Sequence, residues 1–154
     1  MSVERTVVLL KPDALQRDLL GEIIGRFERK GLKIIAMKII PLTEELLDEH
    51  YAHIADKPFY PDMKKYMMDT PVVAMILEGI EAIAEVRKLV GSTNPRAADA
   101  GTIRADLSMN MPSNLVHASD GGEAAADEIK RFFADNEIFS YEKLSDKFIF
   151  REGV

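Results

Sequence analysis

His117 is the residue of this chain whose neighbours most suggest chemistry. It follows an apolar step, precedes Ser119 and Asp120, and two glycines come next. This pattern predicts that a strand ends and a helix begins, with the serine or the aspartate as the helix cap. Backbone N–H groups at a helix start favour an anion, and a neutral imidazole facing that anion can attack phosphorus. Without further neighbours, an exposed histidine beside a helix cap is the better description.

The chain lacks the glycine-rich sequence G-x-x-x-x-G-K-[ST], which binds phosphates through backbone N–H groups. An enzyme of nucleotides without that sequence must hold the phosphates with side chains. Arg87, Thr93 and Arg104 are candidates, since a guanidinium group can pair two phosphate oxygens at once. Arg87 falls at helical spacing on the apolar stripe that begins at Ile80, where an arginine either extends to the edge of the core or reaches a ligand. Thr93 and Arg104 lie within residues 91–113, where solvent-exposed side chains are the usual outcome.

Length and composition limit the classes to which this protein can belong. The 154 residues are enough for about one domain, and we expect residues 1–154 to form it. A net charge of −6 without a basic stripe disfavours a nucleic-acid partner, and the longest apolar run, residues 72–77, is too short to cross a membrane. No cysteine is present, which excludes disulfides, thiolate zinc sites and a cysteine nucleophile. The first residues do not resemble an export signal, so we expect a cytoplasmic protein.

Apolar periodicity predicts the elements that must position these side chains. Strands are expected over residues 6–10, 33–40, 72–77 and 115–117. Helices are expected over residues 21–30, 61–69, 80–90 and 124–134, and Thr43 should cap one more. The order is the split βαβ pattern with additional helices. The first and third strands should be central because they are the most apolar, and residues 91–113, without regular structure, should form a binding loop.

The helix that begins at Thr43 carries two further histidines. His50 and His53 have a spacing that could hold a metal, but no third ligand is apparent, and an exposed helix face is the better interpretation. We therefore predict no metal-binding residue. Tyr51 shares a face with apolar neighbours, so its ring should pack in the core with the hydroxyl directed towards the site.

Several motifs in order resemble one family. The sequence N-x-x-H-x-S-D at residues 114–120 and the sequence VVLLKPDA at residues 7–14 resemble nucleoside diphosphate kinases. The similarity continues through residues 53–61, 70–75, 93–95 and 101–104, and it covers nearly the whole chain without a gap. The resemblance implies a ferredoxin-like α+β fold, a βαββαβ sandwich whose four-stranded antiparallel sheet carries additional helices.

The resemblance also implies the reaction. Such an enzyme transfers the γ-phosphoryl group of a nucleoside triphosphate to a nucleoside diphosphate by a ping-pong mechanism, through a phosphohistidine that matches His117. Glu128 lies beside the apolar stripe of its helix, from which its carboxylate could reach back and fix the imidazole tautomer. Ser119 could link Glu128 to the histidine. The alternative is a non-catalytic ferredoxin-like module that binds a ligand or a partner, which would leave these residues without a purpose.

Substrate contacts follow from the same match. It assigns Lys11 to sugar and phosphate, and Asn114 to the ribose hydroxyls, where a solvated lysine and a turn asparagine are the ordinary interpretations. Phosphate contacts fall to the three residues Arg87, Thr93 and Arg104, and Mg²⁺ is carried by the nucleotide phosphates. Phe59 would stack on the base, with Met111 on the other side, and stacking tolerates any base.

Self-association is the last expectation. Residues 33–40 form the strand most suited to a sheet edge, and an uncovered apolar edge invites pairing with a second copy. The family forms such dimers and assembles them further, and its hexameric members share a longer C-terminal segment, here residues 140–154, that reaches a neighbouring subunit. Pro95 would stiffen a trimer contact by fixing φ. We expect a homohexamer, a trimer of dimers.

Overall fold

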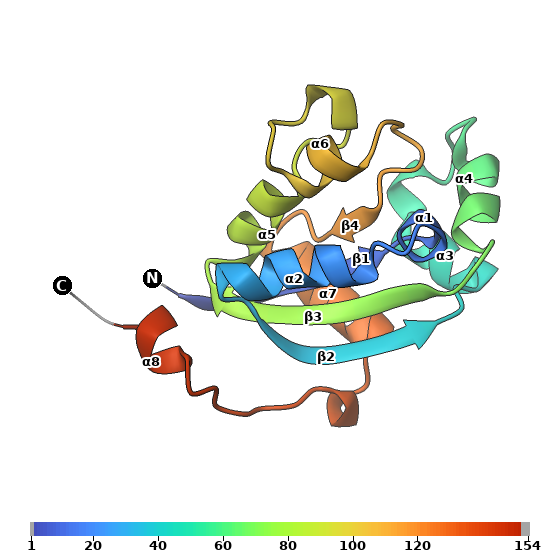
Figure 1. Cartoon of the computed structure of the whole chain (residues 1–154). Coiled ribbons are helices and arrows are strands. Elements are labelled where there is room, and N and C mark those ends of the chain that lie inside the picture. Colours follow the sequence, from blue (N-terminus) through green and yellow to red (C-terminus); the bar gives the residue numbers. More distant parts are fainter. Residues whose placement is uncertain (1, 152–154) are drawn as a thin grey trace.

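A computed structural model describes residues 2–151 as one sheet covered by helices (Figure 1). The strands are β1 (Val3–Leu10), β2 (Lys33–Ile40), β3 (Val72–Ile80) and β4 (Val116–Ala118). Their spatial order is β2-β3-β1-β4, and each neighbouring pair is antiparallel. The predicted four-stranded ferredoxin-like sheet is confirmed, with β1 and β3 central and β2 at an edge.

The longer helices lie close to their predicted positions. They are α2 (Leu20–Lys30), α3 (Glu44–His50), α4 (Tyr60–Met67), α5 (Ala82–Val90) and α7 (Gly122–Phe132). Thr43 caps α3 as predicted, because its side chain accepts a hydrogen bond from the backbone N–H of Leu46. Gly31 ends α2 with a φ of 100°, a conformation that glycine adopts without steric cost. Periodicity missed the short helices α1 (Pro12–Gln16) and α8 (Asp146–Ile149).

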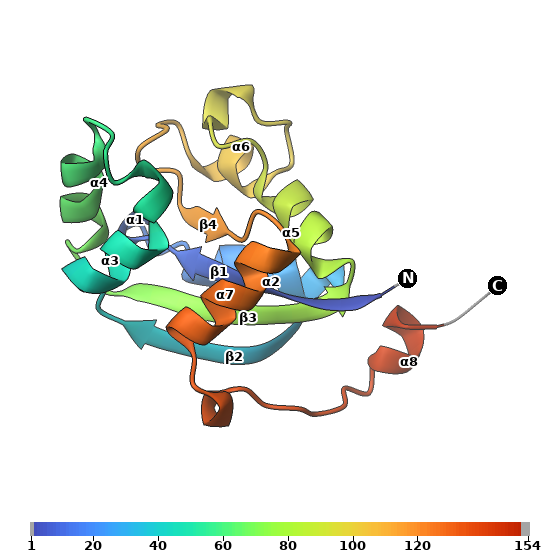
Figure 2. The ribbon, with the colours of Figure 1, turned by 180° about the vertical axis from the view of Figure 1, so that it is seen from behind.

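Helices cover both faces of the sheet, which explains the continuous apolar runs of the central strands. Along β1, Val8 and Leu10 belong to the core that α2 and α5 cover, whereas Val7 and Leu9 belong to the core under α3, α4 and α7. The view from behind shows α7 crossing this second face (Figure 2). Among residues 2–151, none of the helices combines the length and the apolar content that a membrane crossing requires.

The stretch expected to lack regular structure contains two short helices. A 3-10 helix spans Pro95–Ala97 and α6 spans Ile103–Leu107. Asn94 and Thr102 precede them, and each side chain accepts a hydrogen bond from a backbone N–H of the turn that follows. The prediction for residues 91–113 was therefore wrong in this respect. Helices of three to five residues are too short for an apolar period to develop, and their caps are the only local signal.

The helix predicted over residues 80–90 begins later than expected. Ile80 still belongs to β3, Glu81 turns the chain with a φ of 49°, and α5 starts at Ala82. The buried face of α5 consists of Ala82, Val86 and Val90. Arg87 therefore does not lie on the buried stripe where the sequence placed it, and 48% of its side chain is exposed.

The C-terminal segment follows the outer edge of β2. The Phe139 N–H donates to the Ile35 carbonyl at 2.8 Å, and the Tyr141 hydroxyl donates to the Ile34 carbonyl at 2.5 Å. A β-bulge between Ile34 and Ala36 shifts the alternation of β2, so that Ile35 and Ala36 are both buried and Met37 is exposed. Residues 152–154 of the segment expected to reach a neighbouring subunit lie outside the described residues.

Candidate active site

A cavity of about 1000 Å³ lies between β4, α7, α5 and the arm formed by α3 and α4. Almost every residue proposed from the sequence lines it. These residues are Lys11, Tyr51, Phe59, Arg87, Thr93, Arg104, Met111, Asn114, His117 and Glu128. Ser119 is the exception and lies behind Glu128, fully buried. The fold thus brings residues from distant parts of the chain to one concave surface.

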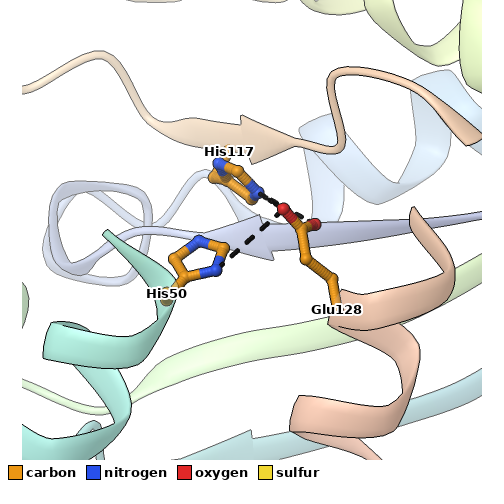
Figure 3. A group of neighbouring side chains, drawn as sticks. All are labelled: His50, His117 and Glu128. Atoms are coloured by element: carbon orange, nitrogen blue, oxygen red, sulfur yellow. Dashed lines mark hydrogen bonds and ion pairs between the residues drawn. The ribbon is translucent and has the colours of Figure 1, made fainter. Parts of the chain in front are cut away.

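The centre of the cavity is a histidine bonded to a carboxylate. His117 lies on β4, and both carboxylate oxygens of Glu128 on α7 lie 3.1 Å from its Nε2 atom (Figure 3). The hydroxyl of Ser119 donates to Oε2 of the same carboxylate at 2.6 Å. Glu128 therefore contacts His117 directly, and Ser119 orients the carboxylate instead of linking the two residues as the sequence suggested. Ser119 also accepts the Val7 N–H and is not the cap of α7, which begins after Gly121 without a side-chain cap.

The electrostatics of this pair fix the tautomer. Burial raises the pKa of Glu128, but the hydrogen bonds from His117 and Ser119 outweigh burial, and the pKa falls below its usual value. An ionised carboxylate can only accept, so Nε2 of His117 carries the proton. The Nδ1 atom lies on the side of the ring turned away from Glu128 (Figure 3). Its lone pair is the free nucleophilic position of the imidazole.

His50 is a second buried histidine beside the first, and the expectation of an exposed helix face was wrong for it. Its ring lies edge-on to that of His117 with centroids 4.5 Å apart, and Phe132 packs against it. Burial lowers the pKa of His50 to about 3, so it is neutral at neutral pH. The available signal was its spacing of three residues from Leu47, which is also buried. His53 is exposed as predicted.

The same cluster offers metal-ligand atoms. His50, His117 and Glu128 place one such atom each within 4.8 Å of one another. However, the guanidinium of Arg131 lies 3.2 Å from Nδ1 of His50, and a cation bound there would have to displace it. The hydrogen-bonded arrangement therefore suits a histidine oriented by a carboxylate better than a resident metal ion.

Lys11 and Asn114 form a connected pair on the adjacent wall. The Lys11 ammonium donates to the Asn114 side-chain oxygen at 2.7 Å, and the Asn114 amide donates to the Thr93 carbonyl at 2.9 Å. Burial, followed by the charge of Arg104, lowers the pKa of Lys11 to about 8. The solvated interpretation of Lys11 is therefore wrong, because its ammonium group is desolvated, and Asn114 is a buried residue whose side-chain amide is bonded at both its oxygen and its nitrogen.

The two arginines of the cavity have different environments. Arg104 is buried, and its three nitrogens donate to the backbone carbonyls of Asn114, Gly91 and Val116 at 2.6–3.2 Å. Burial and the charge of Arg87 lower the pKa of Arg104 to about 10, so it remains charged at neutral pH. Arg87 is half-exposed and donates to the Asp120 carboxylate at 2.6 Å. Arg104 thus braces the chain before His117 and also faces the cavity.

Apolar side chains surround the opening of the cavity. Phe59, at the start of α4, is 55% exposed, and Met111, in the loop before β4, is 54% exposed. Tyr51 lies deeper, with its ring centroid 6.4 Å from that of His117, and burial raises the pKa of its hydroxyl. A flat ligand could enter between these side chains and place an attached phosphate chain near His117.

Comparisons with known proteins identify relatives of similar length. A family model described as nucleoside diphosphate kinase matches residues 4–138. A nucleoside diphosphate kinase of Parabacteroides distasonis is 53% identical over 91% of this chain and 92% of its own, and one of Archaeoglobus fulgidus is 49% identical over 97% and 99%. Among solved structures, a Halobacterium salinarum nucleoside diphosphate kinase in complex with CDP superposes with a TM-score of 0.93 at 40% identity, covering 96% of this chain and 99% of that chain. A Borrelia burgdorferi nucleoside-diphosphate kinase, as a transition state mimic with vanadate and ADP, superposes with a TM-score of 0.90 at 34% identity, covering 96% and 97%.

Proposed function

The chain belongs to the nucleoside diphosphate kinase family and has that activity, and we propose that it transfers the γ-phosphoryl group through a phosphohistidine at His117. The observation that carries the proposal is the bond between Nε2 of His117 and Glu128, which leaves Nδ1 free. The non-catalytic alternative is not favoured, because the matched relatives are named as kinases.

In the first half-reaction, the Nδ1 lone pair attacks the γ-phosphorus of a nucleoside triphosphate. A P–N bond forms, the bond from phosphorus to the bridging oxygen breaks, and the diphosphate leaves with the electron pair. The ring becomes cationic as it gains the phosphoryl group, and the carboxylate of Glu128 stabilises that charge through Nε2. In the second half-reaction, a terminal oxygen of another nucleoside diphosphate attacks the same phosphorus; a P–O bond forms, the P–N bond breaks, and its electron pair returns to Nδ1, which regenerates neutral His117.

Cations of the cavity supply the charge that phosphoryl transfer requires. We assign Arg87 and Arg104, with the Thr93 hydroxyl, to the phosphates, and Lys11 to the sugar and phosphate. Asn114 would bond the ribose hydroxyls. Mg²⁺ prefers oxygen ligands and keeps several waters, so it fits an ion that the nucleotide phosphates carry into the site.

Base binding rests on Phe59 and Met111 at the opening of the cavity. Their exposed apolar surfaces suit stacking, and stacking is tolerant of base identity because every base has a π-face. The relatives' solved complexes contain CDP in one case and ADP in another, a pyrimidine and a purine nucleotide. We infer that this chain also accepts both classes.

Assembly into a homohexamer, a trimer of dimers, and a cytoplasmic location complete the proposal. The exposed apolar side chains of the edge strand β2, Met37 and Ile39, support pairing of two copies. Phe139, Leu144 and Phe148 of the C-terminal segment are also exposed and would be covered by a neighbouring subunit. Light scattering decides the question: a mass near six chains supports the proposal, near four chains favours a tetramer, and near one chain rejects the edge-strand argument.

The nucleophile is tested by matched histidine variants. His117→Ala should abolish both phosphoenzyme formation and nucleotide exchange, whereas exposed His53→Ala should retain both. Initial-rate plots should give parallel lines, as a ping-pong mechanism requires. Phosphorylation that persists in His117→Ala, or intersecting lines, would contradict the mechanism.

A further inference from the structure

Leu115, two residues before His117, has an unusual backbone conformation. Its φ is 71°, in the left-handed region that a residue with a Cβ atom rarely adopts, and its side chain is fully buried. Such a conformation persists only where the surroundings hold it. Because Leu115 joins Asn114 to β4, its backbone determines where both Asn114 and His117 point.

Both backbone polar groups of Leu115 are held by the start of α1, where Lys11 is the N-cap and Asp13 lies in the first turn. The Leu115 carbonyl accepts the Lys11 N–H at 2.8 Å, and the Leu115 N–H donates to Oδ2 of Asp13 at 3.1 Å. This N–H is buried, so it has no alternative acceptor in water. The Asp13 carboxylate is thus the group that satisfies Leu115 in its left-handed conformation.

The second oxygen of Asp13 is bonded to the opposite side of the site. The hydroxyl of Tyr66 donates to Oδ1, and Tyr66 lies on α4, the helix that begins next to Phe59. Tyr66 lines the large cavity, whereas Asp13 itself does not. One buried carboxylate therefore connects the arm that carries Phe59 with the segment that carries Asn114 and His117.

We propose that Asp13 is a positioning residue for phosphoryl transfer, whose carboxylate holds the strained Leu115 and fixes the Phe59 arm relative to His117. This inference rests on the roles of His117 and Phe59 proposed above. Transfer needs the attacking nitrogen, phosphorus and leaving oxygen in line, and a small misplacement of one partner lowers the rate severely. Asp13 acts on that alignment through the backbone of Leu115 and through Tyr66.

A pair of variants at Asp13 separates positioning from charge. In Asp13→Ala the buried Leu115 N–H loses its acceptor, and the rate at saturating nucleotide should fall roughly ten- to hundredfold. In Asp13→Asn the amide oxygen can still accept from Leu115 while the amide N–H donates to the Tyr66 oxygen. The conservative variant should therefore recover to within about threefold of the wild-type rate.

A second pair isolates the connection to the arm. Tyr66→Phe removes only the hydroxyl that donates to Asp13, and it should raise the KM for nucleoside diphosphates about three- to tenfold with little change in kcat. Tyr60 is the matched control on the same helix, because its hydroxyl also donates to an aspartate, Asp48. Tyr60→Phe should leave KM and kcat unchanged, since Lys64 still holds Asp48 at 3.0 Å.

The decisive experiment measures kcat, KM and phosphoenzyme formation for these four variants beside the wild-type protein, with circular dichroism to confirm folding. The expected pattern is a kcat loss together with a KM rise in Asp13→Ala, recovery of both in Asp13→Asn, and a KM rise with little change in kcat in Tyr66→Phe but not in Tyr60→Phe. A folded Asp13→Ala protein with wild-type kcat, an Asp13→Asn protein as slow as it, or an unchanged KM in Tyr66→Phe would overturn the inference. Failure of the wild-type protein to form a phosphoenzyme would instead contradict the proposed function.

Discussion

The cavity has two regions that differ in both burial and hydrogen bonding: the floor, around His117, and the mouth, which is the opening beside Phe59 and Met111. At the floor, Glu128, Asn114 and Arg104 are buried, and each makes at least two hydrogen bonds. At the mouth, Phe59 and Met111 expose more than half of their apolar side chains. A floor held by many bonds fixes the reacting atoms, whereas an apolar mouth imposes little on the base. We propose that this difference makes the enzyme exacting about phosphate geometry and permissive about the nucleoside.

The largest effect should come from removing the charge at the floor. In Glu128→Gln an amide oxygen can still accept from Nε2 of His117, but the negative charge that we propose stabilises the phosphohistidine is lost. We expect the rate of phosphoenzyme formation to fall on the order of a hundredfold, about 3 kcal/mol. Rapid-quench measurement with a nucleoside triphosphate checks this. A rate within a factor of two of wild type would mean that the carboxylate only orients the ring.

At the mouth the effect should be smaller and independent of the base. Phe59→Ala should weaken binding of ADP, GDP and CDP by similar amounts, about 1–3 kcal/mol each. Calorimetric titration of the three diphosphates makes the comparison directly. A loss confined to one base would show that hydrogen bonds to base edges are made, and the contrast between floor and mouth would then fail.

The pH dependence should report Lys11. Because the pKa of this lysine is lowered to about 8, the free enzyme loses a positive charge at the site as pH rises through that value. We expect kcat/KM to fall several-fold above about pH 8, and Lys11→Gln to be slower but without this fall. The effect on folding stability has the opposite sign. Between pH 8 and 10.5 the unfolded chain binds more protons than the folded chain, so the free energy of unfolding should rise with pH. A kcat/KM profile that is flat across pH 7–9.5 would contradict this assignment.

The smallest of these effects should come from a change at Ser119, which contacts Glu128 and not His117 itself. Ser119→Ala removes a donor to Glu128 and an acceptor for the Val7 N–H, but leaves the bond between Glu128 and His117 in place. We expect kcat to fall about two- to fivefold, as for one hydrogen bond of average strength. A loss as large as that of Glu128→Gln would mean that Ser119 is part of the charge-stabilising group itself.

Much of the fold could be predicted because its signals are local. The apolar runs of β1 and β3 indicate strands buried on both faces, and the edge position of β2 follows from its weaker pattern. Ten of the residues that line the cavity were also named from the sequence, because short motifs around them resemble those of one family. The predicted helix boundaries were wrong where one residue changes the direction of the backbone. At Glu81 a left-handed φ delays the start of α5, and Arg87 does not lie on the buried face of that helix.

Other features depend on contacts between distant segments and have no local signal. His50 becomes buried only because α7 packs against α3 and places Phe132 and Arg131 beside it. Arg104 lies in a stretch that reads as solvated, yet its donors are taken by carbonyls up to 13 residues away. The bond between Asp13 and Leu115 spans 102 residues. Such contacts follow from the tertiary arrangement and not from periodicity.

In the proposed mechanism, the cavity presents one nitrogen of His117 to phosphorus. This is tested most directly by phosphorylating protein that contains nitrogen-15-labelled histidine with ATP and Mg²⁺, and then locating the phosphoryl group by nuclear magnetic resonance. We expect a single acid-labile, alkali-stable phosphoryl group on Nδ1 of His117, with Nε2 still protonated and bonded to Glu128. A phosphoryl group on Nε2, or on any other residue, would contradict it.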